Sequence, residues 1–437
     1  MSFLPSRLLL ISLALLALNS VPAVVLGRGL WVVLAAATLL GWAVWQRLAW
    51  ESDLVVSCRR RPPLVGHLGR EGRIELQLRS HIGQPVWVEL MDGCPWQLGA
   101  GEQLHRVVLQ PYQVAILSYR ICPRSRGAVA FGLVRLRLRR RWDLVERIFE
   151  QDIGGQLRVL PDLTGLGTHG THTALQRLRA GGRRKVRVLG REGEFDRLRD
   201  FVPGDDLRHV DWKATARLGR PLTRRFQAER SQKLLVAVDA SRLMASRSGS
   251  GTKLDHAVQA ALMLTFAALE QGDQVGVAVF DHGVRAYLPP RPGKAQFRRV
   301  LSLLYDQQPV RSVPCYREVA RVLAGAHRRR ALVVWLTDLV DQQQGRDLGA
   351  ALVALRSRHL NLVVAIDDPE VAALARQIPG DDAQLFAVAA ATQAVADRRL
   401  LLRGLELRCS SLLASSPAEV GADLVAKYLD LKLAGRL

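Results

Sequence analysis

Acidic and hydroxyl side chains follow two apolar segments of the sequence, at positions where a metal ion could be bound. Asp239 and Ser241 come directly after the apolar run 234–238, and Asp338 comes shortly after the run 331–336. If both runs are strands of one parallel sheet, their carboxyl ends meet at the edge where such sheets bind ligands. Two carboxylates and a hydroxyl suit Mg²⁺ better than Zn²⁺. The alternative is that Ser241 caps a helix and both aspartates are turn residues.

A dense group of charged residues lies between residues 192 and 225. One interpretation is an ion-pair network that fixes a loop onto the next domain, and the spacing favours it because such networks commonly mimic sites. The other is a recognition surface, or an acidic metal site of the nuclease type. The candidate partner-binding residues in this segment are Arg199, Gly204, Asp205, Asp206, Arg208, Asp211, Trp212, Lys213 and Arg217.

The segment that must position Asp239 and Asp338 extends from residue 233 to residue 437. Strands are expected at 234–238, 274–280, 331–336, 361–366 and 406–410, and the clearest helices at 254–271 and 417–433. Helical patterns separate most of these strands. Such alternation is typical of a doubly wound, mainly parallel α/β sheet.

Residues 51–162 show a different pattern, in which apolar and polar residues alternate with period two. Residues 74–79 and 134–139 are examples, and Gly and Pro residues separate the runs. This pattern predicts a β-sandwich-like domain of immunoglobulin-like size. Residues 163–232 then form a Gly- and Arg-rich linker that leads into the charged segment.

The first fifty residues contain no Lys, Asp or Glu. Residues 8–26 are almost entirely apolar, and at about 1.5 Å per residue they span roughly 28 Å, close to a bilayer core. A second apolar stretch covers residues 30–45. We therefore predict a transmembrane hairpin over residues 1–50, with a cleaved signal peptide as the alternative. The arginines after the second span place the other domains in the cytoplasm, at a bacterial inner membrane.

The composition excludes several classes of protein. The 437 residues are 49% hydrophobic, which supports a large core and excludes general disorder. The net charge of +22 suits contact with an anionic lipid bilayer. Five scattered cysteines without a CxxC motif argue against a disulfide framework and a Cys-based zinc site. The sequence lacks GxxxxGK[ST], GxSxG and HExxH, so nucleotide chemistry would belong to a partner.

The run from Phe195 to Arg225, together with residues 236–244, resembles the signature of the family called domain of unknown function 58. The resemblance extends to the paired apolar spans, the β-rich region, a von Willebrand A-like domain and a C-terminal helix containing residues 427–432. It implies a membrane-bound protein that is often encoded beside MoxR-type AAA+ ATPases and transglutaminase-like membrane proteins.

The resemblance also implies a metal-ion-dependent adhesion site, since related von Willebrand A domains carry Asp-x-Ser-x-Ser followed by a distant Thr and a distant Asp. Asp239, Ser241 and Asp338 match three of these positions. Leu243 stands at the third position of the motif and offers no oxygen, and Ser312 is the only suggestion for the Thr. A site that lacks two hydroxyl ligands is expected to bind Mg²⁺ weakly, or to be a degenerate structural pocket.

Three functions remain open from the sequence. The preferred one is a non-enzymatic adaptor or scaffold that binds a MoxR-type AAA+ ATPase in envelope-related or protein-maturation work. The alternative is a nucleic-acid-binding protein or Mg-dependent nuclease that uses Asp205, Asp206, Asp211 and neighbouring arginines, although no nucleic-acid partner is expected. A cell-wall or peptide hydrolase has the weakest support, because no nucleophile motif is present.

Overall fold

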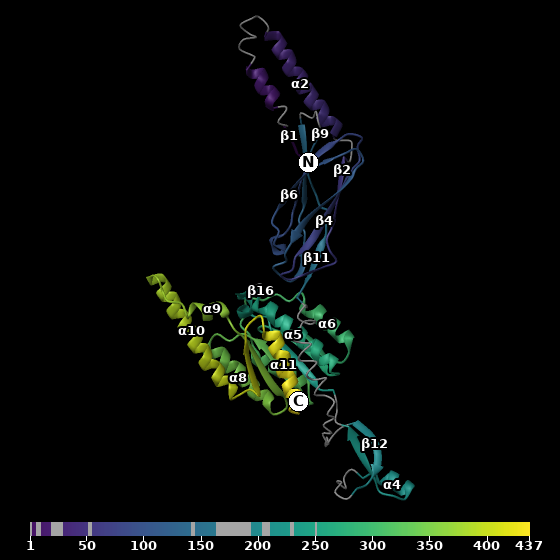
Figure 1. Ribbon diagram of the computed structural model, residues 1–437, viewed down its shortest axis with the longest axis vertical. Helices are drawn as coiled ribbons and strands as arrows, with labels where there is room; N and C mark the ends of the chain where they lie inside the picture. The colour runs from purple at the N-terminus through teal and green to yellow at the C-terminus, as the bar shows by residue number, and fades with distance from the viewer. Residues whose placement is uncertain are drawn as a thin grey trace. The chain divides into compact units, whose positions relative to one another are not determined.

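The computed structural model shows a mixed α/β protein with several separate sheets (Figure 1). It describes residues 2–5, 10–18, 29–50, 55–140, 145–162, 194–202, 210–227, 231–249 and 251–437. The chain divides into two compact units, Met1–Leu160 and Pro161–Leu437.

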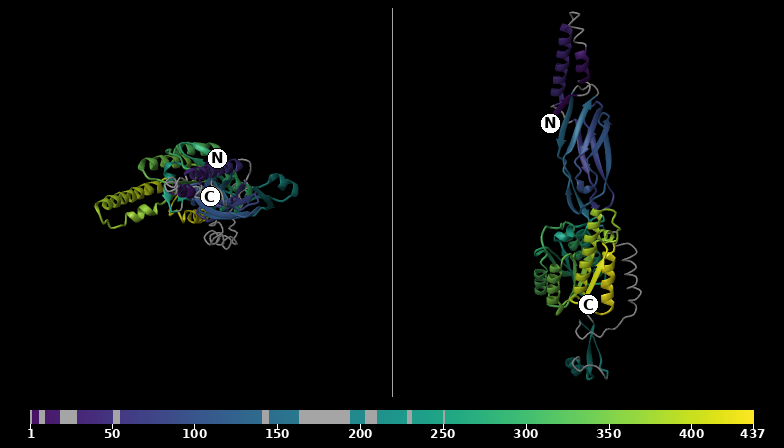
Figure 2. Two further views of the ribbon diagram at one scale, coloured as in Figure 1. Left: turned by 90° about the horizontal axis from the view of Figure 1, so that it is seen from above. Right: turned by 90° about the vertical axis from the view of Figure 1, so that its left-hand side faces the viewer.

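The first unit is built from β-strands in three sheets. Their orders are β1-β10-β9-β5-β6, β2-β4-β7 and β3-β11-β8, and all neighbours are antiparallel except β3 and β11. The strands are β1 (Ser2–Pro5), β2 (Val56–Arg61), β3 (Val65–His67), β4 (Gly72–Ser80), β5 (Val86–Asp92), β6 (Gln103–Leu109), β7 (Val114–Ile121), β8 (Gly127–Ala130), β9 (Val134–Arg140), β10 (Val145–Gln151) and β11 (Gln156–Leu160). Figure 2 shows them running lengthwise beside one another.

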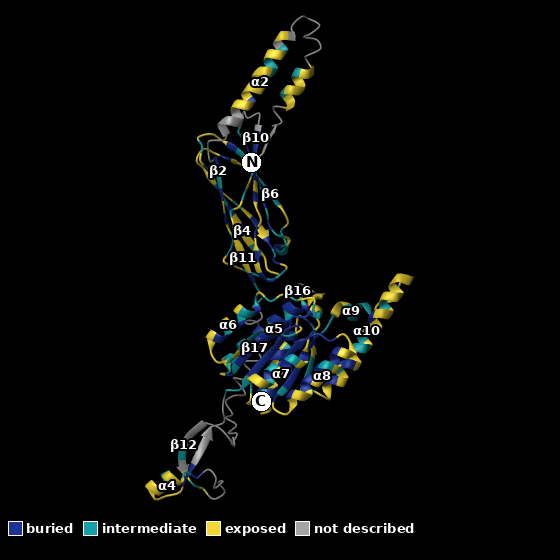
Figure 3. Ribbon diagram, turned by 180° about the vertical axis from the view of Figure 1, so that it is seen from behind, coloured by how far each residue is buried: buried dark blue, intermediate teal, exposed yellow. Residues whose placement is uncertain are grey.

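Alternation of side chains gives this unit its core. In β4, Ile74, Leu76 and Leu78 are fully buried, while the polar residues between them are exposed or half-buried. The apolar residues of β5 and β9 alternate in the same way, and the sheets share one hydrophobic cluster. Figure 3 colours the buried residues dark blue. Because successive side chains of a strand point to opposite faces, the period-two pattern of the sequence is confirmed here.

The N-terminal apolar residues form helices, but among the described residues none is both long and apolar enough to cross a membrane. Residues 10–18 are helical. Helix α2 covers Gly29–Trp50. The predicted transmembrane hairpin over residues 1–50, and the multi-pass inner-membrane localisation that depended on it, are therefore contradicted.

The second unit contains a six-stranded sheet in the order β18-β17-β14-β19-β20-β21. Its neighbours are parallel except at the edge, where β18 is antiparallel to β17. The strands are β14 (Lys233–Asp239), β17 (Gln274–Phe280), β18 (Val284–Arg291), β19 (Leu332–Thr337), β20 (Leu360–Ile366) and β21 (Ser411–Ser415). The alternation of strands and helices therefore predicts this mainly parallel sheet correctly.

Helices cover both faces of this sheet. They are α5 (Lys253–Glu270), α6 (Lys294–Leu304), α7 (Tyr316–Ala326), α8 (Gln342–Arg356), α9 (Pro369–Leu374), α10 (Asp382–Glu406) and α11 (Val420–Leu433). Leu234, Val236 and Val238 of β14 belong to the cluster with α5, α6 and α11, whereas Leu235 and Ala237 belong to the cluster with α7, α8 and α10. Accordingly, α5 and α11 lie in front of the sheet in Figure 1, and α7 and α8 in Figure 3.

The last strand differs from the prediction. The sequence favours a strand over residues 406–410, but α10 continues to Glu406 and β21 begins at Ser411. Leu401 and Leu405, four residues apart, are buried on one face of α10, so helical spacing determines the structure here. The first half of α10 extends away from the sheet (Figures 1 and 2) and is largely exposed.

The charged segment folds locally as a β-hairpin with one helix. Strand β12 (Glu194–Asp200) pairs in antiparallel orientation with β13 (Leu222–Gln227), and α4 (Trp212–Leu218) lies between them in the sequence. The helix begins because the Asp211 side chain accepts hydrogen bonds from the Lys213 and Ala214 amides. It ends at Gly219, whose φ of 68° suits glycine.

Candidate functional site

The carboxyl ends of β14 and β19 bring the predicted site residues together. The two strands are parallel neighbours, with Val238 opposite Leu336, so Asp239 and Asp338 follow at the same edge of the sheet. Asp239, Ser241 and Asp338 are all fully or almost fully buried. The structure therefore brings these three residues to one edge of the sheet and buries their side chains, which the sequence did not indicate.

The Asp239 carboxylate is held by two donors. The Ser241 amide donates to Oδ1 at 2.8 Å, and the Thr337 hydroxyl donates to Oδ2 at 2.6 Å. The Tyr316 hydroxyl lies 2.9 Å from Thr337 Oγ1, and it must be the donor there because Thr337 uses its single proton toward Asp239. Thr337 was not among the predicted site residues, although its place directly before Asp338 at a strand end was the available signal.

Burial raises the pKa of Asp239 from 3.8 to about 6, although hydrogen bonds from Thr337 and Ser241 oppose this effect. Because the folded state holds this proton more tightly than the unfolded chain, the carboxyl contributes its full stability below about pH 4. That contribution is lost as the pH rises to about 6, and its size is ~3 kcal/mol.

We therefore expect Asp239→Asn to remove much of the decrease in unfolding free energy between pH 4 and pH 6. The asparagine can still accept from the Ser241 amide and can donate to Thr337 Oγ1. Urea denaturation across this pH range measures the effect. Asp306→Asn makes the same change at an exposed position and should keep the wild-type profile. An unchanged slope in Asp239→Asn would show that this carboxyl does not titrate there.

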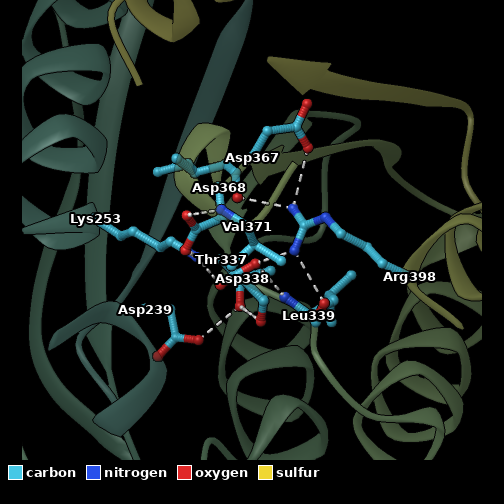
Figure 4. Close-up of polar contacts among 10 residues, drawn as sticks. Asp239, Lys253, Thr337, Asp338, Leu339, Asp367, Asp368, Val371 and Arg398 are labelled. Atoms are coloured by element: carbon cyan, nitrogen blue, oxygen red, sulfur yellow. Dashed lines mark hydrogen bonds and ion pairs between the residues drawn. The ribbon is translucent and has the colours of Figure 1, made fainter. Parts of the chain in front are cut away.

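Asp338 has different partners from Asp239. Lys253 Nζ donates to its Oδ2 at 2.7 Å, and Arg398 Nη1 donates to its Oδ1 at 2.5 Å (Figure 4). The Leu339 amide also donates to Oδ1, at 2.8 Å. Burial by itself would raise the pKa of Asp338, but the charges of Arg398 and Lys253 outweigh it and hold this pKa below 3.8.

Lys253 and Arg398 also connect Asp338 to the residues at the end of β20. Lys253 Nζ is also 3.2 Å from Asp368 Oδ2, after β20. Arg398, on α10, donates to the Ile366 carbonyl at 2.7 Å and approaches Asp367 at 3.3 Å. We call this network the strand-end cluster; it consists of Asp239, Lys253, Thr337, Asp338, Asp367, Asp368 and Arg398 (Figure 4). It ties the ends of three strands to α5 and α10.

The donor set does not fit the predicted Mg²⁺ site. Both oxygens of Asp338 already bind cationic side chains. Ser241 contacts Asp239 through its amide, and its buried Oγ makes no hydrogen bond of good geometry with the residues that the structure describes. Within the described part of the chain, no group of three or more His, Cys, Asp or Glu residues is arranged to hold a metal ion. Asp239, Ser241 and Asp338 thus lie close together but form an ion-pair and hydrogen-bond network.

The predicted partner-binding residues have varied environments. Trp212, Lys213 and Arg217 are exposed on α4, whereas Asp211 serves as the N-cap of that helix. Arg199 lies in β12 opposite Thr223. The other four predicted partner-binding residues lie outside the described part of the chain: Gly204, Asp205, Asp206 and Arg208.

Residues 197–381 match the family model described as "Protein of unknown function DUF58". The chain carries a DUF58 region. This confirms the resemblance of the segment that begins near Phe195. The DUF58 region contains α4 and every member of the strand-end cluster except Arg398, which lies beyond its C-terminal limit.

Curated relatives of this chain are uncharacterized proteins of Mycobacterium bovis and Mycobacterium tuberculosis. Each is 26% identical over 216 residues, which is 49% of this chain and 63% of the relative. The match therefore spans somewhat less than two thirds of the length of these relatives.

Two solved structures to which this chain is similar give distant matches. The conserved hypothetical protein BatB from Bacteroides thetaiotaomicron is 13% identical with a TM-score of 0.28, and the match covers 47% of this chain and all of BatB. Proximal thread matrix protein 1 from the mussel byssus is 12% identical with a TM-score of 0.28, and the match covers 46% of each chain. Likenesses of this size do not assign a function.

Proposed function

We propose that the chain is a non-enzymatic adaptor whose DUF58 region binds a protein partner through the loops at the carboxyl edge of the six-stranded sheet. The observation that supports this proposal is that these loops are joined to one another and present exposed valines. The proposal follows the von Willebrand A-like interpretation of the sequence, in which this edge is the contact surface.

Backbone hydrogen bonds join the loops that leave the sheet. The Val310 amide donates to the Ala240 carbonyl at 2.9 Å, and the Arg242 amide donates to the Ser312 carbonyl at 3.1 Å. The Cys315 amide likewise donates to the Asp281 carbonyl at 2.8 Å. The segment before α7 is therefore fixed to the loops that follow β14 and β17. A surface held in place before binding loses less conformational entropy on association.

Apolar side chains lie on these fixed loops. Val310, Val313 and Val340 are 41%, 56% and 55% exposed. Val340 follows Leu339, whose amide is bound by Asp338, so the strand-end cluster determines where this loop leaves the sheet. Single exposed valines are common, but three on connected loops at the ligand-binding edge of an α/β sheet favour an interaction surface.

A MoxR-type AAA+ ATPase is the partner we propose, because the family resemblance implies such a neighbour. The exposed Trp212, Lys213 and Arg217 of α4 offer a second contact, since aromatic residues and arginine are enriched in protein interfaces. The nuclease alternative gains no support from Asp211, whose carboxylate caps a helix.

The double variant Val313→Asp, Val340→Asp is expected to weaken binding of the full chain to a purified MoxR-type ATPase. Placing two charges in an apolar contact should raise the Kd by about tenfold or more. Biolayer interferometry with the tagged chain measures the change.

Val353→Asp is the matched control for this experiment. Val353 is 56% exposed, like the two tested valines, but it lies near the end of α8, which runs back toward the opposite edge of the sheet. This variant should bind as the wild type does. Equal binding by all three proteins would exclude the carboxyl edge as the contact surface, and no binding by the wild type would exclude this class of partner.

A further inference from the structure

The position of Lys253 is unusual for a lysine. It is the first residue of α5, an 18-residue helix that begins with a capping box between Thr252 and Asp255. The N-terminus of a helix carries partial positive charge, so a cation there is unfavourable. Lys253 is also only 4% exposed, and a buried ammonium group requires charged partners. Both costs must be offset by the acidic residues around it.

Lys253 Nζ has the surroundings of a bound cation. Asp338 Oδ2 at 2.7 Å and Asp368 Oδ2 at 3.2 Å come from the loops after two adjacent strands, β19 and β20. The remaining oxygen of Asp338 binds Arg398 and the Leu339 amide. A positive charge is therefore already supplied where the sequence pattern places a divalent ion.

We propose that the ammonium group of Lys253 is the resident cation of the strand-end cluster, taking the place of a divalent metal ion beside Asp338. The carboxyl edge of the sheet is then held together without Mg²⁺, and its loops keep their arrangement when metal is removed. The ammonium group is covalently part of the first turn of α5, so it cannot dissociate as a bound metal ion can. This inference does not depend on the identity of any binding partner.

The first test uses the unmodified full chain. Its melting temperature is expected to be the same in EDTA and in millimolar Mg²⁺ or Mn²⁺, and isothermal titration with either ion should show no binding. A melting temperature that rises with Mg²⁺ and falls with EDTA would overturn the proposal without any variant.

The second test removes the tethered cation. Lys253→Ala leaves the Asp338 and Asp368 carboxylates facing the space of the lost side chain, so this variant should be less stable than the wild type and should gain affinity for Mn²⁺. We expect isothermal titration to detect Mn²⁺ binding by this variant, with an affinity about tenfold or more above the upper limit that the wild type sets. n-Propylammonium, which replaces the missing part of the side chain, should also raise its melting temperature.

Two further variants distinguish a cation site from a general packing effect. Lys253→Met fills the space without a charge and should be destabilised without rescue by Mn²⁺ or n-propylammonium. Lys294→Ala removes a lysine from the same helical position of α6, where it is exposed, and should respond to neither. If Lys253→Ala gains no response to either cation, or if it does not fold while Lys253→Met retains wild-type stability, the charge of Lys253 is not what the cluster requires.

Discussion

Asp92→Ala is expected to destabilise the first unit by about 3–5 kcal/mol, because it leaves a buried guanidinium without its carboxylate. Arg60 Nη2 lies 2.5 Å from Asp92 Oδ1, and both side chains are completely buried. The Tyr119 hydroxyl also donates to Asp92, at 2.7 Å. Among the described residues, Arg60 then retains the neutral carbonyls of Gly132 and Gly154 and the face of the Phe131 ring. Urea denaturation of the full chain, with hydrogen exchange of β2 and β5, measures the loss.

Arg106→Ala is the matched control for this prediction. Arg106 Nε lies 2.8 Å from Glu89 in the same sheet as Asp92, but its side chain is 71% exposed. Exposed pairs contribute little, so a loss under about 1 kcal/mol is expected. The double variant Arg60→Met, Asp92→Ala should recover part of the stability lost in Asp92→Ala, because it removes the unpaired charge. Equal losses in Asp92→Ala and Arg106→Ala would show that burial does not determine the strength of these pairs.

The sequence predicts the elements that follow from a local rule. Ile74, Leu76 and Leu78 alternate because one face of β4 is buried. The continuous apolar run in β14 arises because helices cover both faces of its sheet. The rule fails for the first fifty residues, where hydropathy along the sequence favours two membrane spans and the described helices do not provide them.

The strand-end cluster could be predicted only in part, since its members come from distant positions. Asp239 and Asp338 follow recognisable strands, but the partners of Asp338 lie 85 residues before it, at Lys253, and 60 residues after it, at Arg398. No local pattern joins them. The one available signal was a lysine at the start of an apolar helix, where an acidic residue is the favourable choice. Asp211 shows the same limitation, because a carboxylate that caps a helix and one that binds a metal look alike in sequence.

The C-terminal run Lys427–Lys432, which forms part of the family resemblance, has a structural explanation in Asp273. This fully buried carboxylate follows the turn at Gly272, after α5. Lys432 Nζ donates to its Oδ2 at 2.6 Å, the Tyr428 hydroxyl donates to the same oxygen, and the Gln232 amide donates to Oδ1 at 2.9 Å. One side chain therefore fixes α11 and the residue before β14 to the start of β17.

Asp273→Ala is accordingly expected to destabilise the second unit by about 3–5 kcal/mol, since it leaves a buried hydroxyl, an ammonium group and an amide without their acceptor. The amides of α11 should lose most of their protection from hydrogen exchange, because Tyr428 and Lys432 hold this helix against the turn after α5. Lys427→Ala removes a charge from the same helix next to Tyr428 and should leave this protection close to that of the wild type. If α11 exchanges equally slowly in both variants, packing of Leu424 and Val425 in the core holds the helix without help from Asp273.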